Sequence, residues 1–137
     1  MKMFSAIGAI VLAFSNMIAE EVTKLTQGER IYCRITYYHP YQDKWGSRVA
    51  CPRTTKAKQG VTVAAHPSFD FGTRVYIPEL AGKVGDGYFV VQDRGAWVTK
   101  KKASKGKHYV FDVFVSSKSS YRKMLKNNPY MWVYASK

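Results

Sequence analysis

The chain has few of the residues from which metal sites and nucleophilic active sites are built. It contains two cysteines and three histidines in 137 residues, and these are too scattered to show the spacing of zinc ligands. It also has no glycine-rich phosphate loop, no Ser/His/Asp order and no cysteine in the context of a nucleophile. We therefore expect no metal and no other cofactor, which leaves acid–base side chains as the candidates for chemistry.

Acidic residues are also scarce. Nine Asp and Glu stand against 22 Lys and Arg, so the formal net charge is +13. Such a balance favours polyanionic surroundings, namely wall polymers, acidic membrane headgroups or nucleic acid, and charge alone does not choose among them. With 46% hydrophobic and 15% aromatic residues, the chain can build a packed core, which excludes disorder. Its length suits one domain.

The chain has a single long apolar run, at its start. Residues 1–19 begin with the positive charge of Lys2 and continue in an uncharged run rich in Ala, Ile, Val and Leu, the pattern of a secretory signal peptide. The run is too short for a confident membrane span, although an uncleaved anchor is an alternative. We expect a linker over residues 20–30 and one domain over 31–137. The protein is then a secreted monomer, periplasmic or wall-associated, with no stable membrane span.

Both cysteines fall in the exported part. Cys33 and Cys51 have 17 residues between them. In an oxidising compartment an even pair predicts a disulfide, which would contribute roughly 3 kcal/mol by loop closure. Two buried free thiols are the alternative.

Six short runs rich in Tyr, Val, Ile and Phe predict β-strands separated by turn signals. These runs are Ile31–Tyr38, Val61–Ala65, Thr73–Pro78, Gly87–Gln92, Tyr109–Val115 and Tyr130–Ala135. A helix is expected before the last run, capped by Ser117 or Ser119 and stopped by Asn127-Asn128-Pro129. Six strands and one helix in about 105 residues predict a mainly β fold, a small closed or half-closed barrel with long insertions at 39–60 and 96–108.

Two aspartates lie within, or directly after, predicted strands. Asp112 interrupts the apolar run Tyr109–Val115, so desolvation should raise its pKa and keep it protonated, as an acid that cleaves a glycosidic bond must be. The alternative is a structural carboxylate that caps a turn or pairs with a lysine. Asp93 ends another apolar run before Arg94-Gly95. It is either an Asx-turn residue or a second carboxylate that tunes the first.

Other candidates surround these two. His66 ends a predicted strand before a proline and is either a proton shuttle or a rim histidine. Tyr41, Trp45 and Trp97 are candidates for a surface on which sugars stack, and Arg94 is a candidate substrate contact. Trp132 is predicted to pack in the core. The lysines at 100, 101, 102, 105 and 107 form either a solvated loop or a clamp for an anionic polymer.

These motifs resemble a known group of wall proteins. Ala64-Ala65-His66 with Gly72-Thr73 and Asp93-Arg94-Gly95 resembles the double-psi β-barrel of the rare lipoprotein A family. Gln92-Asp93-x-Gly95 followed by Phe111-Asp112 resembles the three-aspartate domain of membrane-bound lytic transglycosylase A and of spore and stationary-phase wall enzymes. The resemblance covers roughly residues 31 to 134. It implies a six-stranded double-psi barrel with one short helix before its last strand.

The resemblance also implies a function. Those enzymes cut peptidoglycan between N-acetylmuramic acid and N-acetylglucosamine without water and leave a 1,6-anhydro end. Asp112 matches the acid/base, Asp93 the second aspartate, and His66 the histidine of the lipoprotein family, at a position where the three-aspartate pattern has Asp. Peptidoglycan strands or another anionic wall polymer are the expected partner, and nucleic acid is not. A non-catalytic, expansin-like wall-binding module is the alternative, and a basic secreted nuclease is a weaker one.

Overall fold

The computed structural model describes residues 30–54 and 56–136. The predicted signal peptide and almost all of the predicted linker lie outside the described residues. Within the described ranges, no helix combines the length and the apolar character that a membrane crossing requires.

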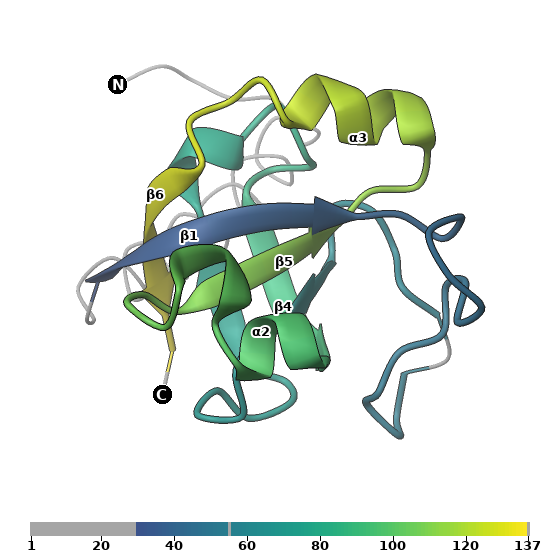
Figure 1. Cartoon of the computed structure of the whole chain (residues 1–137), viewed down its shortest axis with the longest axis horizontal. Coiled ribbons are helices and arrows are strands. Elements are labelled where there is room, and N and C mark those ends of the chain that lie inside the picture. Colours follow the sequence, from purple (N-terminus) through teal and green to yellow (C-terminus); the bar gives the residue numbers. More distant parts are fainter. Residues whose placement is uncertain (1–29, 55, 137) are drawn as a thin grey trace, which may run out of the picture.

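Six strands close into a barrel in the order β1-β5-β2-β4-β3-β6 (Figure 1). The strands are β1 Arg30–Tyr38, β2 Thr62–Ala64, β3 Arg74–Tyr76, β4 Tyr88–Asp93, β5 Val110–Phe114 and β6 Tyr130–Ala135. β1 with β5 and β2 with β4 pair in parallel, and the other four pairs are antiparallel. The predicted six-stranded, mainly β barrel is confirmed, with strand ends within two residues of those expected.

The helix expected before the last strand is α3, Lys118–Met124. The Ser117 hydroxyl caps it by accepting a hydrogen bond from the backbone N–H of Ser120 at 3.1 Å, as the sequence predicts. α3 lies beside β1 on the outside of the barrel wall (Figure 1).

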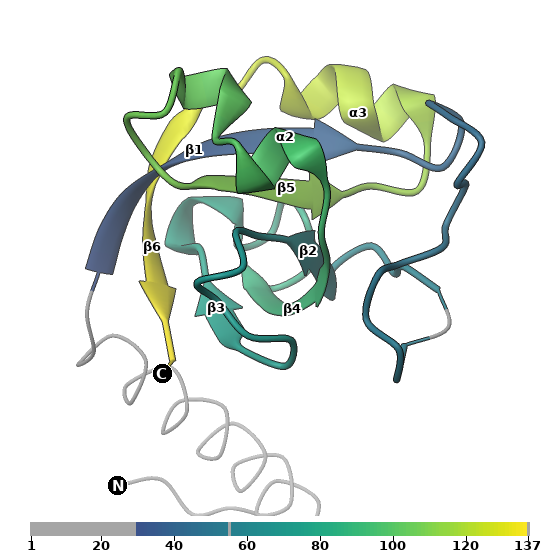
Figure 2. The ribbon, with the colours of Figure 1, turned by 60° about the horizontal axis from the view of Figure 1, so that its bottom comes forward.

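Much of the insertion at 96–108 is helical. It forms α2 Ala96–Thr99 and the 3-10 helix η2 Lys102–Ser104; a second 3-10 helix, η1 Pro78–Leu80, follows β3. α2 lies over β5 and β2 (Figure 2). The physical reason is Val98, which is 1% exposed and packs against Ala64 and Val110 on the outer face of the barrel. Val98, in a segment otherwise rich in lysine, therefore shields apolar side chains of the barrel wall from solvent.

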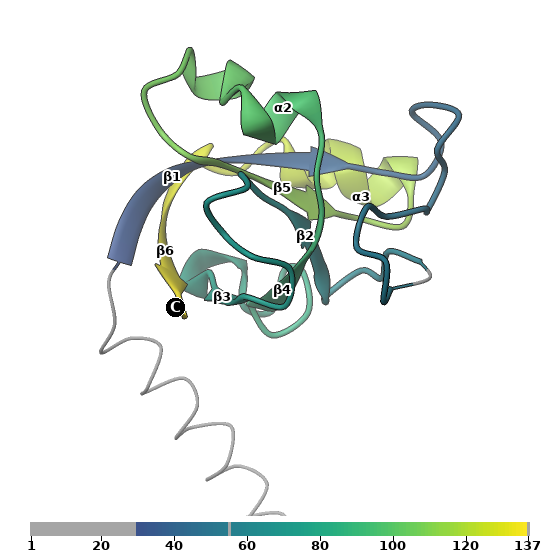
Figure 3. The same cartoon turned by 90° about the horizontal axis from the view of Figure 1, so that it is seen from below.

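Alternation along the strands separates a lumen face from an outer face. On β1 the side chains of Cys33, Ile35 and Tyr37 are buried in the main core, whereas Thr36 and Tyr38 face outward. Figure 3 shows β1 and β5 side by side in the barrel wall. Glycines let connections approach neighbouring backbone closely. A Cβ on Gly87, whose φ is +85°, would lie 2.8 Å from the carbonyl oxygen of Ile77.

The prediction that Trp132 packs in the core is wrong. Its side chain is 40% exposed. On β6 the neighbours Met131 and Val133 are buried in the main core, so alternation turns Trp132 to the outer face of the barrel.

The prediction of a disulfide is wrong as well, since Cys33 and Cys51 are both buried free thiols. Cys33 faces the core from β1, where it pairs with Met131 of β6. Cys51 lies in the loop after β1, and its backbone N–H donates to the Gln92 carbonyl near the end of β4 at 3.0 Å. β5 and β2 separate β1 from β4 in the barrel wall, so the two cysteines are held by different parts of it.

Candidate functional site

The two aspartates lie in one row across the outer face of the barrel. The Cα partners run from Asp93 on β4 to Ala64 on β2, to Asp112 on β5 and to Thr36 on β1. With strands about 4.8 Å apart, two spacings place the aspartate Cα atoms about 10 Å from each other. Alanine is the only residue of the row between them.

A β-bulge brings Asp93 into this row. Strict alternation would put it on the lumen face with Phe89 and Val91, which are fully buried. The register between β2 and β4 shifts after Val63, so that Gln92 is an extra residue on β4. The extra residue turns the Asp93 side chain to the outer face.

Asp112 is held on β5 by a hydrogen bond from the neighbouring strand β1. The Thr36 hydroxyl donates to its Oδ1 at 2.8 Å. Its Oδ2 has no hydrogen-bond partner among the described residues, and the buried side-chain atoms without partners there are only Tyr37 Oη and Tyr88 Oη. The residue as a whole is half-buried, between fully buried neighbours on β5. Burial, which the Thr36 hydrogen bond opposes and the charge of Asp93 reinforces, raises the pKa of Asp112 to about 7.

Asp93 is held by three donors. Its Oδ2 accepts from the Tyr38 hydroxyl at 2.9 Å, and its Oδ1 accepts from the backbone N–H groups of Ala50 at 3.0 Å and Arg94 at 2.9 Å. These contacts suit an ionised carboxylate, which only accepts hydrogen bonds. They also fasten the loop that follows β1 to the end of β4.

Tyr38 lies beside Ala64 and bonds to Asp93. Its ring packs against the cluster that contains Ala64, and it meets Phe114 edge to face with ring centroids 5.2 Å apart. Burial first, and then the charges of Asp93 and Asp112, raise the pKa of the phenol, so it remains a donor. Because Ala64 is small, the phenol can reach Asp93 across the row.

His66 lies in a different environment. Its Nδ1 accepts from the backbone N–H of Ser68 at 3.0 Å, and its ring meets Tyr109 edge to face at 5.3 Å. Burial, followed by the positive charges of Lys101 and Arg94, lowers its pKa. Its contacts within the described residues run to these neighbours and not to either aspartate.

Arg94 is engaged with the chain itself. Its guanidinium donates to the carbonyl oxygens of Ala65 at 3.1 Å and Phe69 at 2.6 Å, and it lies 4.2 Å from the ring centroid of Phe71. These contacts hold the turn after β2 against the end of β4. Arg94 therefore positions the segment that carries His66.

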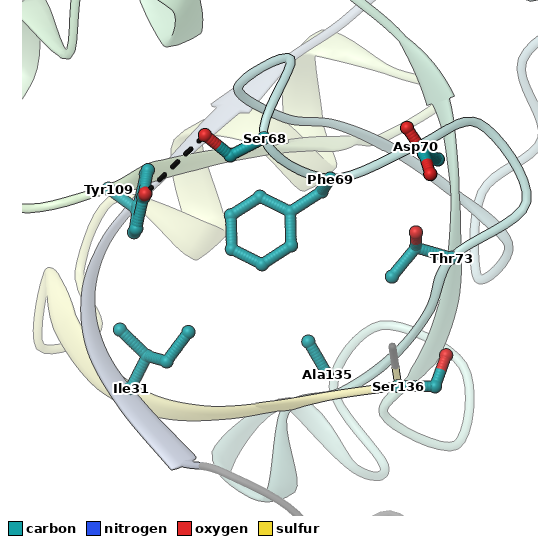
Figure 4. A pocket seen from close by; sticks show the side chains of 8 residues that line it. All are labelled: Ile31, Ser68, Phe69, Asp70, Thr73, Tyr109, Ala135 and Ser136. Atoms are coloured by element: carbon teal, nitrogen blue, oxygen red, sulfur yellow. Dashed lines mark hydrogen bonds between the residues drawn. The ribbon is translucent and has the colours of Figure 1, made fainter.

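The Tyr109 ring that packs on His66 also lines a cavity of about 430 Å³ at the mouth of the barrel (Figure 4). The lining residues are Ile31, Ser68, Phe69, Asp70, Thr73, Tyr109, Ala135 and Ser136. Hydroxyl groups and one carboxylate surround an aromatic ring there. Asp93 and Asp112 are not among the lining residues, so this cavity is separate from their row.

The three aromatic residues expected to stack on sugars are all exposed. Tyr41 and Trp45 lie in the loop after β1 and are 69% and 57% exposed, and Trp97 on α2 is 47% exposed. Lys44 and Arg48 lie over the Trp45 ring, 5.1 and 5.3 Å from its centroid. The loop is joined to Asp93 through the backbone N–H of Ala50, and α2 begins three residues after Asp93.

Sequence reasoning did not assign roles to Thr36 and Tyr38. Both face outward from β1, and each makes a hydrogen bond to one of the two aspartates. The signal was the alternation of residues 31–38, which places them opposite Ile35 and Tyr37. No group of three or more potential metal ligands occurs in the part of the chain that the structure describes.

No protein-family model matches the chain, and no curated protein is significantly similar to it. The resemblance to the three-aspartate and rare lipoprotein A families therefore stays a prediction.

Proposed function

We propose that the protein is a secreted enzyme that cleaves the glycan strands of peptidoglycan in the manner of a lytic transglycosylase. The observation that carries the proposal is Asp112, a half-buried residue on the outer face of the barrel whose carboxyl pKa is raised to about 7 by burial. A carboxylic acid that keeps its proton near neutral pH can protonate the leaving oxygen of a glycosidic bond. Perturbed carboxyl groups of this kind concentrate at functional sites.

The reaction needs one group that acts twice. Asp112 gives its proton to the glycosidic oxygen as the bond from that oxygen to C1 of the muramic acid breaks. The resulting carboxylate then takes the proton of the muramic 6-hydroxyl as its oxygen bonds to C1. The product has a 1,6-anhydro end, Asp112 is protonated again, and no water is consumed. Because the substrate supplies the nucleophile, a second catalytic carboxylate is not required.

The neighbours of Asp112 set its proton affinity. The Thr36 hydroxyl stabilises the carboxylate form, whereas the nearby charge of Asp93 destabilises it. Asp93 acts as a fixed negative charge next to the developing positive charge of the sugar. Tyr38 keeps it in place, and the exposed rings of Trp45 and Trp97 offer apolar faces to the glycan.

A non-catalytic, expansin-like wall-binding module is a second candidate. The observation that favours it is the set of contacts around Asp93, whose three donors are all parts of the protein. Such contacts suit a structural role. The exposed aromatic rings with cations over Trp45 would bind glycan equally well without cleavage.

Digestion of purified peptidoglycan sacculi separates the two candidates. The wild-type chain should release 1,6-anhydro muropeptides, detected by mass spectrometry, and Asp112→Asn should lower the rate by about 10² to 10⁴-fold, the usual contribution of a general acid. Asp86→Asn is the matched control, since Asp86 caps a turn before β4 and can be replaced by Asn without loss of its acceptor. A folded wild-type chain that binds sacculi and releases no anhydro product would establish the binding module instead.

A further inference from the structure

We infer that the outer face of β1 and β6 binds the anionic glycan strand and leads it to Asp112. This inference rests on the proposed function for the identity of the polymer. The surface, here termed the aromatic–arginine stripe, consists of Arg30, Tyr32 and Arg34 on β1, Tyr130 and Trp132 on β6, and His108 from the segment before β5.

The rings of the stripe form one continuous apolar surface. Tyr32 lies 5.0 Å from Trp132 and 5.8 Å from Tyr130, measured between ring centroids, and its plane is nearly parallel to that of Tyr130. His108 meets Tyr32 and Tyr130 edge to face at 6.1 and 5.4 Å. Arg30 lies 4.2 Å from the Trp132 centroid, and Arg34 lies 5.7 Å from that of Tyr130.

The two central rings remain partly open to solvent. Tyr32 and Trp132 are each 40% exposed, although they are direct cross-strand partners. One exposed aromatic residue on a protein surface needs no explanation, but adjacent exposed rings with arginines over them are typical of a binding surface. Rings of this kind offer apolar faces to sugars and leave polar groups at the rim for hydrogen bonds.

The charge around the stripe selects an anionic partner. β1 and β6 contain no Asp or Glu, and neither does the stretch from residue 94 to 111, which carries five lysines. η2, within that stretch, adjoins β1 and β5. A polymer that bears carboxylates would therefore meet the arginines of the stripe and the lysines along its η2 border.

The stripe and the candidate active site share one strand. Tyr32, Arg34, Thr36 and Tyr38 alternate along the outward face of β1. Thr36 bonds to Asp112, so the site begins four residues, or about 13 Å, from Tyr32. A polymer laid along β1 would occupy both places, which makes the stripe a remote subsite for the strand that Asp112 cleaves.

Sedimentation of the full chain with purified sacculi tests this inference. All variants carry Asp112→Asn so that the polymer is not consumed. Arg30→Gln combined with Trp132→Ala should weaken binding about tenfold, which corresponds to about 1.4 kcal/mol. The matched control combines Arg122→Gln with Leu125→Ala at exposed positions of and after α3, and it should bind as the parent does.

Folding of each variant is followed by near-UV circular dichroism and thermal melting, because cross-strand rings also stabilise sheets. Should the double variant unfold, Arg30→Gln alone is the test. It changes an exposed side chain at the first residue of β1 and should weaken binding about threefold at low salt, with less effect at high salt.

Unchanged sacculus binding by the folded double variant would overturn the inference. It would also be overturned if the double variant lost affinity for a single-stranded oligonucleotide while keeping its affinity for sacculi, since the stripe would then be a nucleic-acid surface. The proposed function can be refuted while this inference still holds. If the active chain releases no anhydro product and the double variant still loses sacculus binding, the stripe stands and the enzymatic proposal falls.

Discussion

Replacement of Asp112 by Asn should stabilise the protein, and increasingly so as the pH rises. In the unfolded chain the carboxyl titrates near 3.8, whereas in the folded protein its pKa is about 7. Below about pH 4 it is protonated in both states, and ionisation costs nothing. Between these values the unfolded chain loses its proton first, so the folded state is progressively disfavoured. Above about pH 7 the full cost is present.

The size of the effect follows from the two pKa values. Since one pKa unit corresponds to about 1.36 kcal/mol, the ionised carboxyl of Asp112 destabilises the folded protein by up to about 4 kcal/mol, and by less where solvent screens the charge of this half-buried residue. Asn is uncharged, similar in shape, and keeps an oxygen that accepts from Thr36. The variant should therefore approach this gain at pH 8 and match the wild type near pH 4.

Urea unfolding followed by circular dichroism at pH 4, 6 and 8 measures the difference in free energy of unfolding. Asp86→Asn, which makes the same change at an exposed turn residue, is the matched control. A constant difference between Asp112→Asn and the wild type over this range, or a wild type that is the more stable at pH 8, would show that the Asp112 carboxyl is not perturbed.

Three further outcomes are expected. Thr36→Val removes the donor that lowers the pKa of Asp112, so NMR titration of the Asp112 carboxyl should give a value above that of the wild type; an unchanged or lower value would contradict the contact. Gly87→Ala adds a Cβ against backbone at positive φ and should cost more than about 1 kcal/mol in urea unfolding, whereas a neutral effect would refute the close approach. Denatured, unreduced protein should be alkylated at both Cys33 and Cys51, and protection of the pair would restore the disulfide.

The strands and the barrel could be predicted because their signals are local. Runs of β-branched and aromatic residues between turn residues mark strands wherever the chain later places them. The face that each strand turns inward was harder to predict. In β6 every residue from Tyr130 to Tyr134 is apolar or aromatic, so alternation alone does not say whether Met131 or Trp132 faces the lumen. Barrel closure decides that, and it exposes Trp132.

Only part of the candidate site could be predicted from the sequence, because only part of it depends on local signals. The isolated carboxylate in the apolar run of β5 marks Asp112 from the sequence alone. The face to which the Asp93 side chain turns depends on the extra residue in β4, and no local sequence pattern predicts that bulge. The roles of Thr36 and Tyr38 depend on a pairing of β1 with β5, strands far apart along the chain. The disulfide was inferred from cysteine count and expected compartment, and neither fixes which way a side chain points.

The parallel pairing of β1 with β5 also determines when the site can exist. The Thr36–Asp112 hydrogen bond joins residues 76 positions apart, and the Tyr38–Asp93 bond joins residues 55 apart. Contacts between such distant segments bear the entropic cost of closing long loops and are associated with slow folding. A growing chain that has not yet reached β5 has Asp93 without Asp112 beside it. The proposed site is therefore assembled only at barrel closure, and the same event completes the core.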